Sequence, residues 1–147
     1  MIKNNFVNMK RIKIKSKIIN TVLLVAFALI INTSCDDTIN VFELDNKMIP
    51  SSNVSYNQYI QPVFTAKCAN AGCHDDQIRA GGLSFTSHVN AISDYLVVAP
   101  GLPENSKLIW AIEGNYVDPM PPLGYWGLTS NQIAGIRTWV KEGAKNN

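Results

Sequence analysis

The chain has 147 residues, a length that predicts one small domain, and its 13 Lys and Arg against 11 Asp and Glu give a formal net charge of +2. The basic residues are unevenly distributed, because residues 1–17 hold six of them and no acidic residue. A nucleic-acid-binding domain requires a basic patch or stripe. The rest of the chain lacks that pattern, so we expect no nucleic-acid partner.

Residues 1–34 have the pattern of a secretory signal peptide. The basic stretch is followed by ten consecutive apolar residues, Val22–Ile31, and then by polar and small residues up to Ser34. A membrane-spanning helix needs about 20 apolar residues, so the short run favours a cleaved signal over a retained anchor. Cleavage would leave seven basic residues against 11 acidic ones, and the exported chain would carry a charge near −4.

Cys35 directly follows Ser34 at the end of this signal. The arrangement resembles the lipobox of bacterial lipoproteins, in which the thiol is acylated and the cysteine becomes the new N-terminus. An unmodified exposed thiol would be reactive in an oxidising compartment, which also favours lipidation over plain cleavage. The resemblance implies an exported protein that is anchored by lipid at the bacterial cell envelope, on its periplasmic or outer-surface face.

Residues 35–53 are acidic and polar and end in Pro50-Ser51-Ser52-Asn53. This composition is typical of a tether between a lipid and a folded domain, with one short strand expected at residues 39–44. The folded domain would then comprise residues 54–147.

Helical spacing of apolar residues begins inside this domain. Tyr56, Tyr59, Ile60, Val63, Phe64 and Lys67 follow such a spacing. Because Pro62 falls within the pattern, the helix either kinks or begins there. Shorter helices are expected at residues 87–93 and 106–113.

The clearest helix is predicted at Thr129–Lys141. Thr129 and Gln132 form a capping box, and Leu128 and Ile133 are spaced as a hydrophobic staple. Gly143 provides a C-terminal stop. With no convincing strand ladder elsewhere, the sequence predicts an all-α domain with long Pro- and Gly-rich loops.

The most informative segment is Cys68-Ala69-Asn70-Ala71-Gly72-Cys73-His74. The usual attachment signature for c-type haem is C-x-x-C-H, in which both thiols bond to the haem and the histidine ligates iron. Four residues separate the cysteines here, so the additional two must loop out. Asn70 and Gly72 suit such a loop because both tolerate positive φ. The histidine directly after the second cysteine favours haem attachment.

Two alternatives for the cysteines remain open at this point. Cys68 and Cys73 could form a disulfide in an exported protein, although the closed loop would be very small. A structural zinc site usually needs four N or S ligands, and the sequence offers only these cysteines, His74 and the distant His88.

A haem iron held by one histidine needs a sixth ligand or keeps an open position. Met120, in Asp118-Pro119-Met120-Pro121-Pro122, is the best candidate. Its thioether is a soft ligand that raises the reduction potential, and the flanking prolines restrict the backbone. His88 is the rival ligand, whereas Met48 lies in the predicted tether.

Residues 54–147 resemble a class I-type monohaem cytochrome c domain of the planctomycete type found in exported bacterial lipoproteins. The similarity extends through several blocks, which are Ile60–Phe64, Cys68–His74, Gly81–Phe85, Pro100–Leu108, Met120–Pro122, Leu128–Thr129 and Trp139–Ala144. It implies a small all-α fold wrapped around one covalent haem c.

The resemblance also implies the roles of the motif residues. Thioether bonds would form at Cys68 and Cys73, with His74 as the proximal and Met120 as the distal iron ligand. The implied function is transfer of single electrons between redox partner proteins, without catalysis by the domain itself. The alternatives are a haem subunit or module of a larger redox enzyme complex and a haem-free, disulfide-containing envelope lipoprotein.

Overall fold

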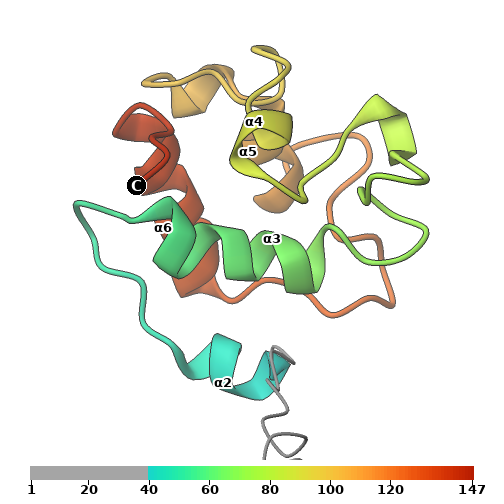
Figure 1. The fold of residues 1–147 in the computed structure, drawn as a ribbon, viewed down its shortest axis with the longest axis horizontal. Coiled ribbons are helices and arrows are strands. Elements are labelled where there is room, and N and C mark those ends of the chain that lie inside the picture. Colours follow the sequence, from blue (N-terminus) through green and yellow to red (C-terminus); the bar gives the residue numbers. More distant parts are fainter. Residues whose placement is uncertain (1–39) are drawn as a thin grey trace, which may run out of the picture. The chain divides into compact units, whose positions relative to one another are not determined.

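The computed structural model describes residues 40–147, so the predicted signal peptide and Cys35 lie outside the described residues. The described residues belong to a compact unit that starts at Ile39. Its elements, in chain order, are α2 (Val41–Asn46), the π-helical turn η1 (Tyr56–Ile60), α3 (Gln61–Lys67), the 3₁₀ turn η2 (Ala80–Gly82), α4 (His88–Ala91), the 3₁₀ turn η3 (Pro103–Asn105), α5 (Lys107–Ile112) and α6 (Ser130–Lys141) (Figure 1). Residues 40–147 contain no strand, which confirms the predicted all-α class.

Aromatic side chains join α6 to η1 and α3 in the core. The α6 ribbon passes behind η1 and α3 in Figure 1, and the Trp139 ring lies 5.2 Å from that of Tyr56 and 6.0 Å from that of Phe64. Phe85 extends the cluster, with its ring centroid 4.9 Å from that of Phe64. The segment that follows the cysteine motif is therefore packed against the same core as the two main helices.

The predicted C-terminal helix is confirmed as α6. The Thr129 side chain accepts a hydrogen bond from the Gln132 N–H, and the Gln132 side chain accepts one from the Thr129 N–H, so the capping box is complete. The helix ends at Lys141, and Gly143 adopts a φ of 98° that glycine reaches without strain.

The structure also decides between the two roles considered for Pro62. The α-helical part begins at Gln61, and Pro62 lies in its first turn, where a missing N–H costs no helical hydrogen bond. The preceding residues form η1, whose start is capped by the Ser55 hydroxyl. Because α3 ends at Lys67, Cys68 is the residue at which the loop with the cysteine motif begins.

The two shorter helices are confirmed within the expected ranges. In α4, the Ser87 hydroxyl accepts a hydrogen bond from the Asn90 N–H and caps the helix. In α5, Leu108, Ile109 and Ile112 are buried in the core.

Residues 40–53 differ from the predicted tether. The predicted strand is wrong, because Val41–Asn46 forms a helix capped by the Asn40 side chain. Leu44 and Ile49 are buried in the core, with exposed fractions of 7% and 6%. The Asn131 side chain also exchanges two hydrogen bonds with the backbone of Ile49, at 2.8 and 3.1 Å. Burial of these two apolar residues thus attaches this segment to the domain.

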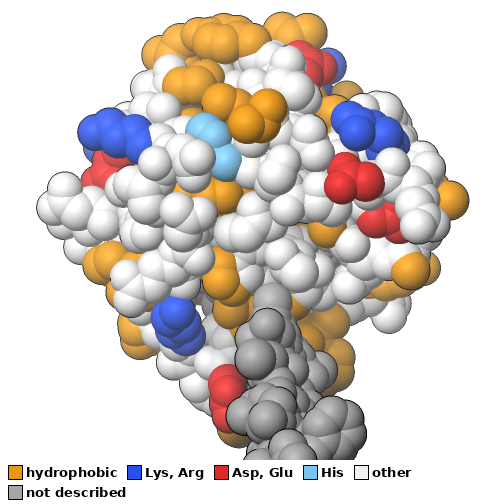
Figure 2. All heavy atoms as spheres, viewed as in Figure 1, with side chains coloured by type: hydrophobic (Ala, Val, Ile, Leu, Met, Phe, Trp, Pro, Cys, Tyr) orange, Lys and Arg blue, Asp and Glu red, His pale blue; other side chains and the backbone are white. Residues whose placement is uncertain are grey.

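Charged groups are dispersed on the face shown in Figure 2. Lys and Arg side chains are separated from one another there, and several lie beside Asp or Glu. No basic patch forms on this face of the described residues.

The close packing between Gly135 of α6 and Ile49 gives a first testable prediction. A Cβ atom at position 135 would lie 2.6 Å from Cγ2 of Ile49. We expect Gly135→Ala to lower the free energy of unfolding by about 1–3 kcal/mol, the usual cost of overpacking, despite a helix-propensity gain of about 1 kcal/mol. Urea unfolding measures the change.

An Ile49→Ala background provides the control for this substitution. Removing most of the Ile49 side chain relieves the clash, so Gly135→Ala should cost less there or become stabilising. An equal cost in both backgrounds would mean that the packing of Ile49 on α6 is not its cause.

Candidate functional site

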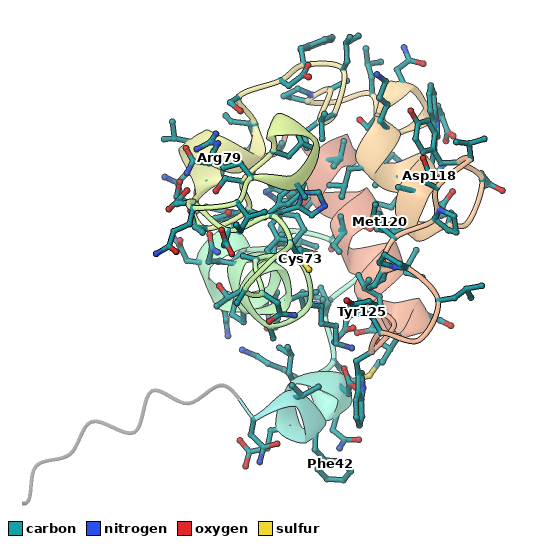
Figure 3. All side chains as sticks on the ribbon, turned by 90° about the vertical axis from the view of Figure 1, so that its right-hand side faces the viewer. Phe42, Cys73, Arg79, Asp118, Met120 and Tyr125 are labelled. Atoms are coloured by element: carbon teal, nitrogen blue, oxygen red, sulfur yellow. The ribbon has the colours of Figure 1, made fainter. Side chains whose placement is uncertain are left out.

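A cavity of about 550 Å³ lies between the cysteine motif and the segment that carries Met120. This volume falls within the range of roughly 300–1,000 Å³ that is usual for ligand pockets. Cys68, Cys73, His74 and Met120 all line the cavity, and Figure 3 shows the face on which Cys73 and Met120 lie. The structure therefore brings together the four residues that the sequence selects, although the first and the last lie 52 positions apart.

The four residues between the cysteines fold into a closed loop. The Cys73 N–H donates to the carbonyl of Asn70 at 2.9 Å, and the His74 N–H donates to that of Cys68 at 3.1 Å. The Asp75 carboxylate accepts a hydrogen bond from the Gly72 N–H at 3.0 Å. These bonds return the chain to the cavity wall after the additional residues, so that both cysteines contribute to that wall.

The two residues expected to form this loop do so by different means. Gly72 has a φ of 87°, as predicted. Asn70 does not adopt a positive φ. Its side-chain amide instead donates to the carbonyl of Ala66 at 3.0 Å and extends the hydrogen bonding of the end of α3 into the loop.

His74 is oriented by a hydrogen bond to the turn η2. Its Nδ1 lies 2.9 Å from the carbonyl oxygen of Ala80. A carbonyl can only accept, so Nδ1 carries the proton and Nε2 keeps its lone pair. The Phe85 ring packs edge-on against the imidazole at 5.4 Å. An imidazole held in this way is ready to ligate a metal through Nε2, because a backbone acceptor on the other nitrogen fixes the tautomer.

Both cysteines of the motif are free thiols and are partly buried. Burial, together with the neighbouring Cys73, raises the pKa of the Cys68 thiol to about 12. The Cys68 sulfur is therefore a neutral thiol at physiological pH.

Met120 reaches the cavity from the opposite segment. Its backbone N–H donates to the carbonyl of Ala111 at 2.9 Å, which ties the segment to α5. Pro121 and Pro122, which follow it, also line the cavity.

His88, the rival ligand, lies elsewhere. Its Nε2 is 2.7 Å from the carbonyl oxygen of Ala144, and its ring packs edge-on against Tyr56 at 4.8 Å. It is not among the residues that line the cavity. Its contacts give it a structural role between α4 and the C-terminal segment.

The remaining cavity wall is largely apolar and aromatic. These side chains include Leu83, Phe85, Val97, Leu108, Ile112, Tyr116, Tyr125, Trp126 and Leu128. An imidazole, a thioether and two thiols facing one apolar space match the donor set of a c-type haem. The residues present therefore fit such a group, with His74 and Met120 available to iron and Cys68 and Cys73 available to the porphyrin edge.

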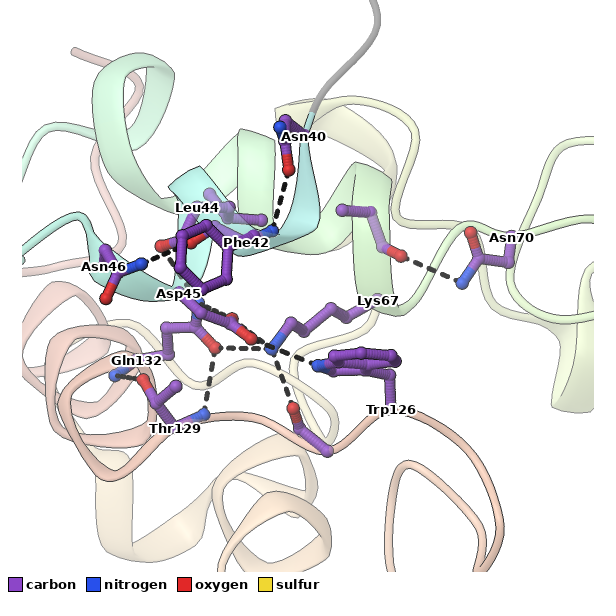
Figure 4. Close-up of polar contacts among 12 residues, drawn as sticks. Asn40, Phe42, Leu44, Asp45, Asn46, Lys67, Asn70, Trp126, Thr129 and Gln132 are labelled. Atoms are coloured by element: carbon purple, nitrogen blue, oxygen red, sulfur yellow. Dashed lines mark hydrogen bonds and ion pairs between the residues drawn. The ribbon is translucent and has the colours of Figure 1, made fainter.

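A buried polar network beside the cavity was not predicted from the sequence. The Lys67 side chain is 1% exposed, and its ammonium donates to Asp45 Oδ1 at 2.5 Å, to the Gly127 carbonyl at 2.7 Å and to Gln132 Oε1 at 3.1 Å. Asp45 Oδ2 also accepts a hydrogen bond from Trp126 Nε1 at 3.1 Å (Figure 4). The presence of Lys67 within an apolar helical pattern is a signal of burial, but nothing near Asp45 identifies it as the partner.

Two further structural findings concern metals and membranes. Within residues 40–147, no cluster of three or more His, Cys, Asp or Glu side chains is placed to hold a metal ion, so the zinc alternative has no ligand cluster there.

The helices of this part of the chain are also too short or too polar to span a bilayer.

Comparison with protein families matched residues 71–124 to a family described as planctomycete cytochrome C. The matched segment includes Cys73, His74 and Met120 and covers less than half of the chain. It supports a cytochrome c-like family and thus a haem-binding electron-transfer protein. Comparisons with curated proteins and with solved structures gave no match.

The Asp45–Lys67 contact leads to a prediction of how the free energy of unfolding changes with pH in the acidic range. Burial opposes ionisation of Asp45, but hydrogen bonds from Lys67, Gln132 and Trp126 outweigh it and hold the pKa of the carboxyl below its ordinary value of 3.8. A pKa lowered by folding stabilises the protein above pH 3.8, and this contribution is lost as the pH falls through the folded-state pKa. We expect Asp45→Asn to reduce the slope of unfolding free energy against pH below pH 3.8.

Denaturant unfolding at closely spaced acidic pH values measures this slope. The Asp45→Asn variant retains two other carboxylates with lowered pKa values, Asp75 and Asp76, so it should keep part of the pH dependence. Identical slopes in the two proteins would show that the Asp45 contact makes no contribution.

Proposed function

We propose that this protein binds one haem c covalently through Cys68 and Cys73 and carries single electrons through a His74- and Met120-ligated iron. The observation that carries the proposal is the shared cavity, which both thiols, the oriented imidazole and the thioether line together. The match to the planctomycete cytochrome C family over residues 71–124 supports it.

Each residue has a defined part in this proposal. The hydrogen bond from His74 to Ala80 would raise the basicity of the ligating nitrogen. The Met120 thioether would favour ferrous iron and raise the potential. The bound haem supplies a centre that gains and loses one electron, and the apolar wall keeps bulk water away from it.

Electron transfer is favoured over catalysis by the number of protein ligands. With a nitrogen and a sulfur ligand both provided by the chain, no position on the iron would remain open for a substrate. An exported chain with a charge near −4 would attract a basic redox partner by long-range electrostatic steering. A transient encounter of this kind suits a carrier.

The experiment that tests the proposal uses full-length protein produced together with haem-attachment machinery. The intact mass of the mature protein, after allowance for lipid on Cys35, should exceed that of its polypeptide by one haem, and a mass two hydrogens below the reduced chain would indicate a disulfide instead. The oxidised protein should show the weak near-infrared band of sulfur-to-iron ligation.

Met120→Ala should abolish the near-infrared band, lower the reduction potential and allow ferrous iron to bind carbon monoxide. Met48→Ala is the matched control, because Met48 is 73% exposed and does not line the cavity. Retention of the wild-type band and potential in Met120→Ala would rule out Met120 as the ligand.

We also propose that Cys35 is acylated and anchors the protein at the bacterial cell envelope. Cys35→Ser should then move the protein from the membrane fraction to the soluble envelope fraction without altering its visible spectrum. A variant that stays in the membrane fraction would show that something other than lipid on Cys35 retains it. Fractionation with haem staining distinguishes the two results.

A further inference from the structure

We propose that the ion pair between the buried Lys67 and the partly buried Asp45 positions Met120, by fixing the segment that carries it against the cavity. The inference rests on the proposed ligation of iron by Met120. It assigns a function in the redox site to Asp45, which lies outside the segment matched by the family.

The Lys67 ammonium makes the hydrogen bonds on which the position of the Met120 segment depends in this proposal. An ammonium group has three hydrogen-bond donors, and those of Lys67 are matched by three acceptors on Asp45, Gly127 and Gln132. A buried charge with all its donors satisfied has one favourable arrangement, so its partners are held in place. Because Lys67 directly precedes Cys68, these partners are held next to the cysteine motif.

Two of the resulting contacts fall on the segment between Met120 and α6. Lys67 binds the Gly127 carbonyl directly, at 2.7 Å. Asp45 binds the neighbouring residue, accepting the Trp126 indole N–H at 3.1 Å. Although Trp126 is 72% exposed, its polar group is thus attached to the Asp45–Lys67 pair, as Figure 4 shows.

The other end of the same segment is attached to α5. The Met120 N–H donates to the Ala111 carbonyl at 2.9 Å. Between the two ends, the Tyr125 N–H donates to the Pro122 carbonyl at 3.1 Å, a bond within the segment itself. Met120, Trp126 and Lys67 all line the cavity. Loss of the attachment at Trp126 and Gly127 would therefore release one end of the loop that presents the thioether.

This positioning role can be separated from a role in stability. Replacing a buried ion pair by apolar side chains of similar size is often neutral or stabilising, whereas removing one partner leaves an uncompensated charge. The double variant Asp45→Leu/Lys67→Met removes both charges together. It also removes the donor to Gly127 and the acceptor for Trp126, so the loop loses its attachment while the interior stays apolar.

The experiment compares this double variant with the wild type as haem-loaded, full-length proteins. We expect a similar unfolding midpoint, a weaker near-infrared band and a rate of carbon monoxide binding to the ferrous protein that is higher by about tenfold, a coupling typical of groups in one network. The Trp126 indole proton should exchange faster with solvent by NMR, a readout that does not depend on electron transfer.

Two further variants complete the comparison. Glu142→Gln is the matched control, because the Glu142 carboxylate accepts the N–H groups of Asn53 at 2.6 Å and Val54 at 2.9 Å and is not among the residues lining the cavity. It should leave the band and the carbon monoxide rate unchanged. Trp126→Phe keeps an aromatic ring but removes the donor to Asp45, and it should shift both readouts in the direction of the double variant.

The outcomes distinguish the inference from the proposed function. A wild-type protein without the near-infrared band would contradict Met120 ligation and, with it, the inference. A wild-type protein with the band, together with a double variant that keeps the wild-type band and carbon monoxide rate, would overturn the positioning role alone. If the double variant fails to fold, Trp126→Phe decides, because unchanged readouts in that variant would contradict the inference.

Discussion

The buried ammonium of Lys67 is the constraint on which the arrangement of the cavity depends. A cation with a side chain 1% exposed needs close acceptors, because transfer of an unpaired ion from water to the interior is very costly. The chain provides acceptors from three separate places, on α2, on the segment before α6 and on α6 itself. Satisfying one charge therefore brings together the parts of the chain that surround the cysteine motif.

The Gln132 side chain makes both a local hydrogen bond, in the cap of α6, and hydrogen bonds to residues that are distant in the sequence. Its Oε1 accepts the Thr129 N–H at 3.0 Å, which completes the cap of α6, and it also accepts from Lys67 at 3.1 Å. The same side chain donates to Asp45 at 3.0 Å. The start of α6 and the position of α2 are thus set by one amide, and a helix cap that stabilises local structure also fixes tertiary structure.

The contrast between predicted and unpredicted features follows from the range of the interactions. The capping box of α6 and the left-handed Gly72 depend on residues within a few positions, so the sequence is sufficient to predict them. The helix α2 depends on Asp45 finding Lys67, 22 residues away, and on Ile49 packing against Gly135 of α6. An acidic, polar stretch gives no local sign of such partners, which is why the sequence suggested a tether there.

The same distinction separates the two sides of the cavity. On the side of His74, the bonds that fix the imidazole and the loop join residues within eleven positions of one another, such as His74 to Ala80 and Phe85 to His74. On the side of Met120, one end of the segment is held by the bond from Met120 to Ala111, nine positions away. The other end is attached by contacts of long range, from Gly127 to Lys67 across 60 positions and from Trp126 to Asp45 across 81. Local contacts persist in partly unfolded states more readily than contacts of long range, whose closure costs more chain entropy. The proposed proximal ligand is therefore held by its own neighbourhood in the sequence, whereas the segment that carries the proposed distal ligand also depends on contacts that form only in the completed fold.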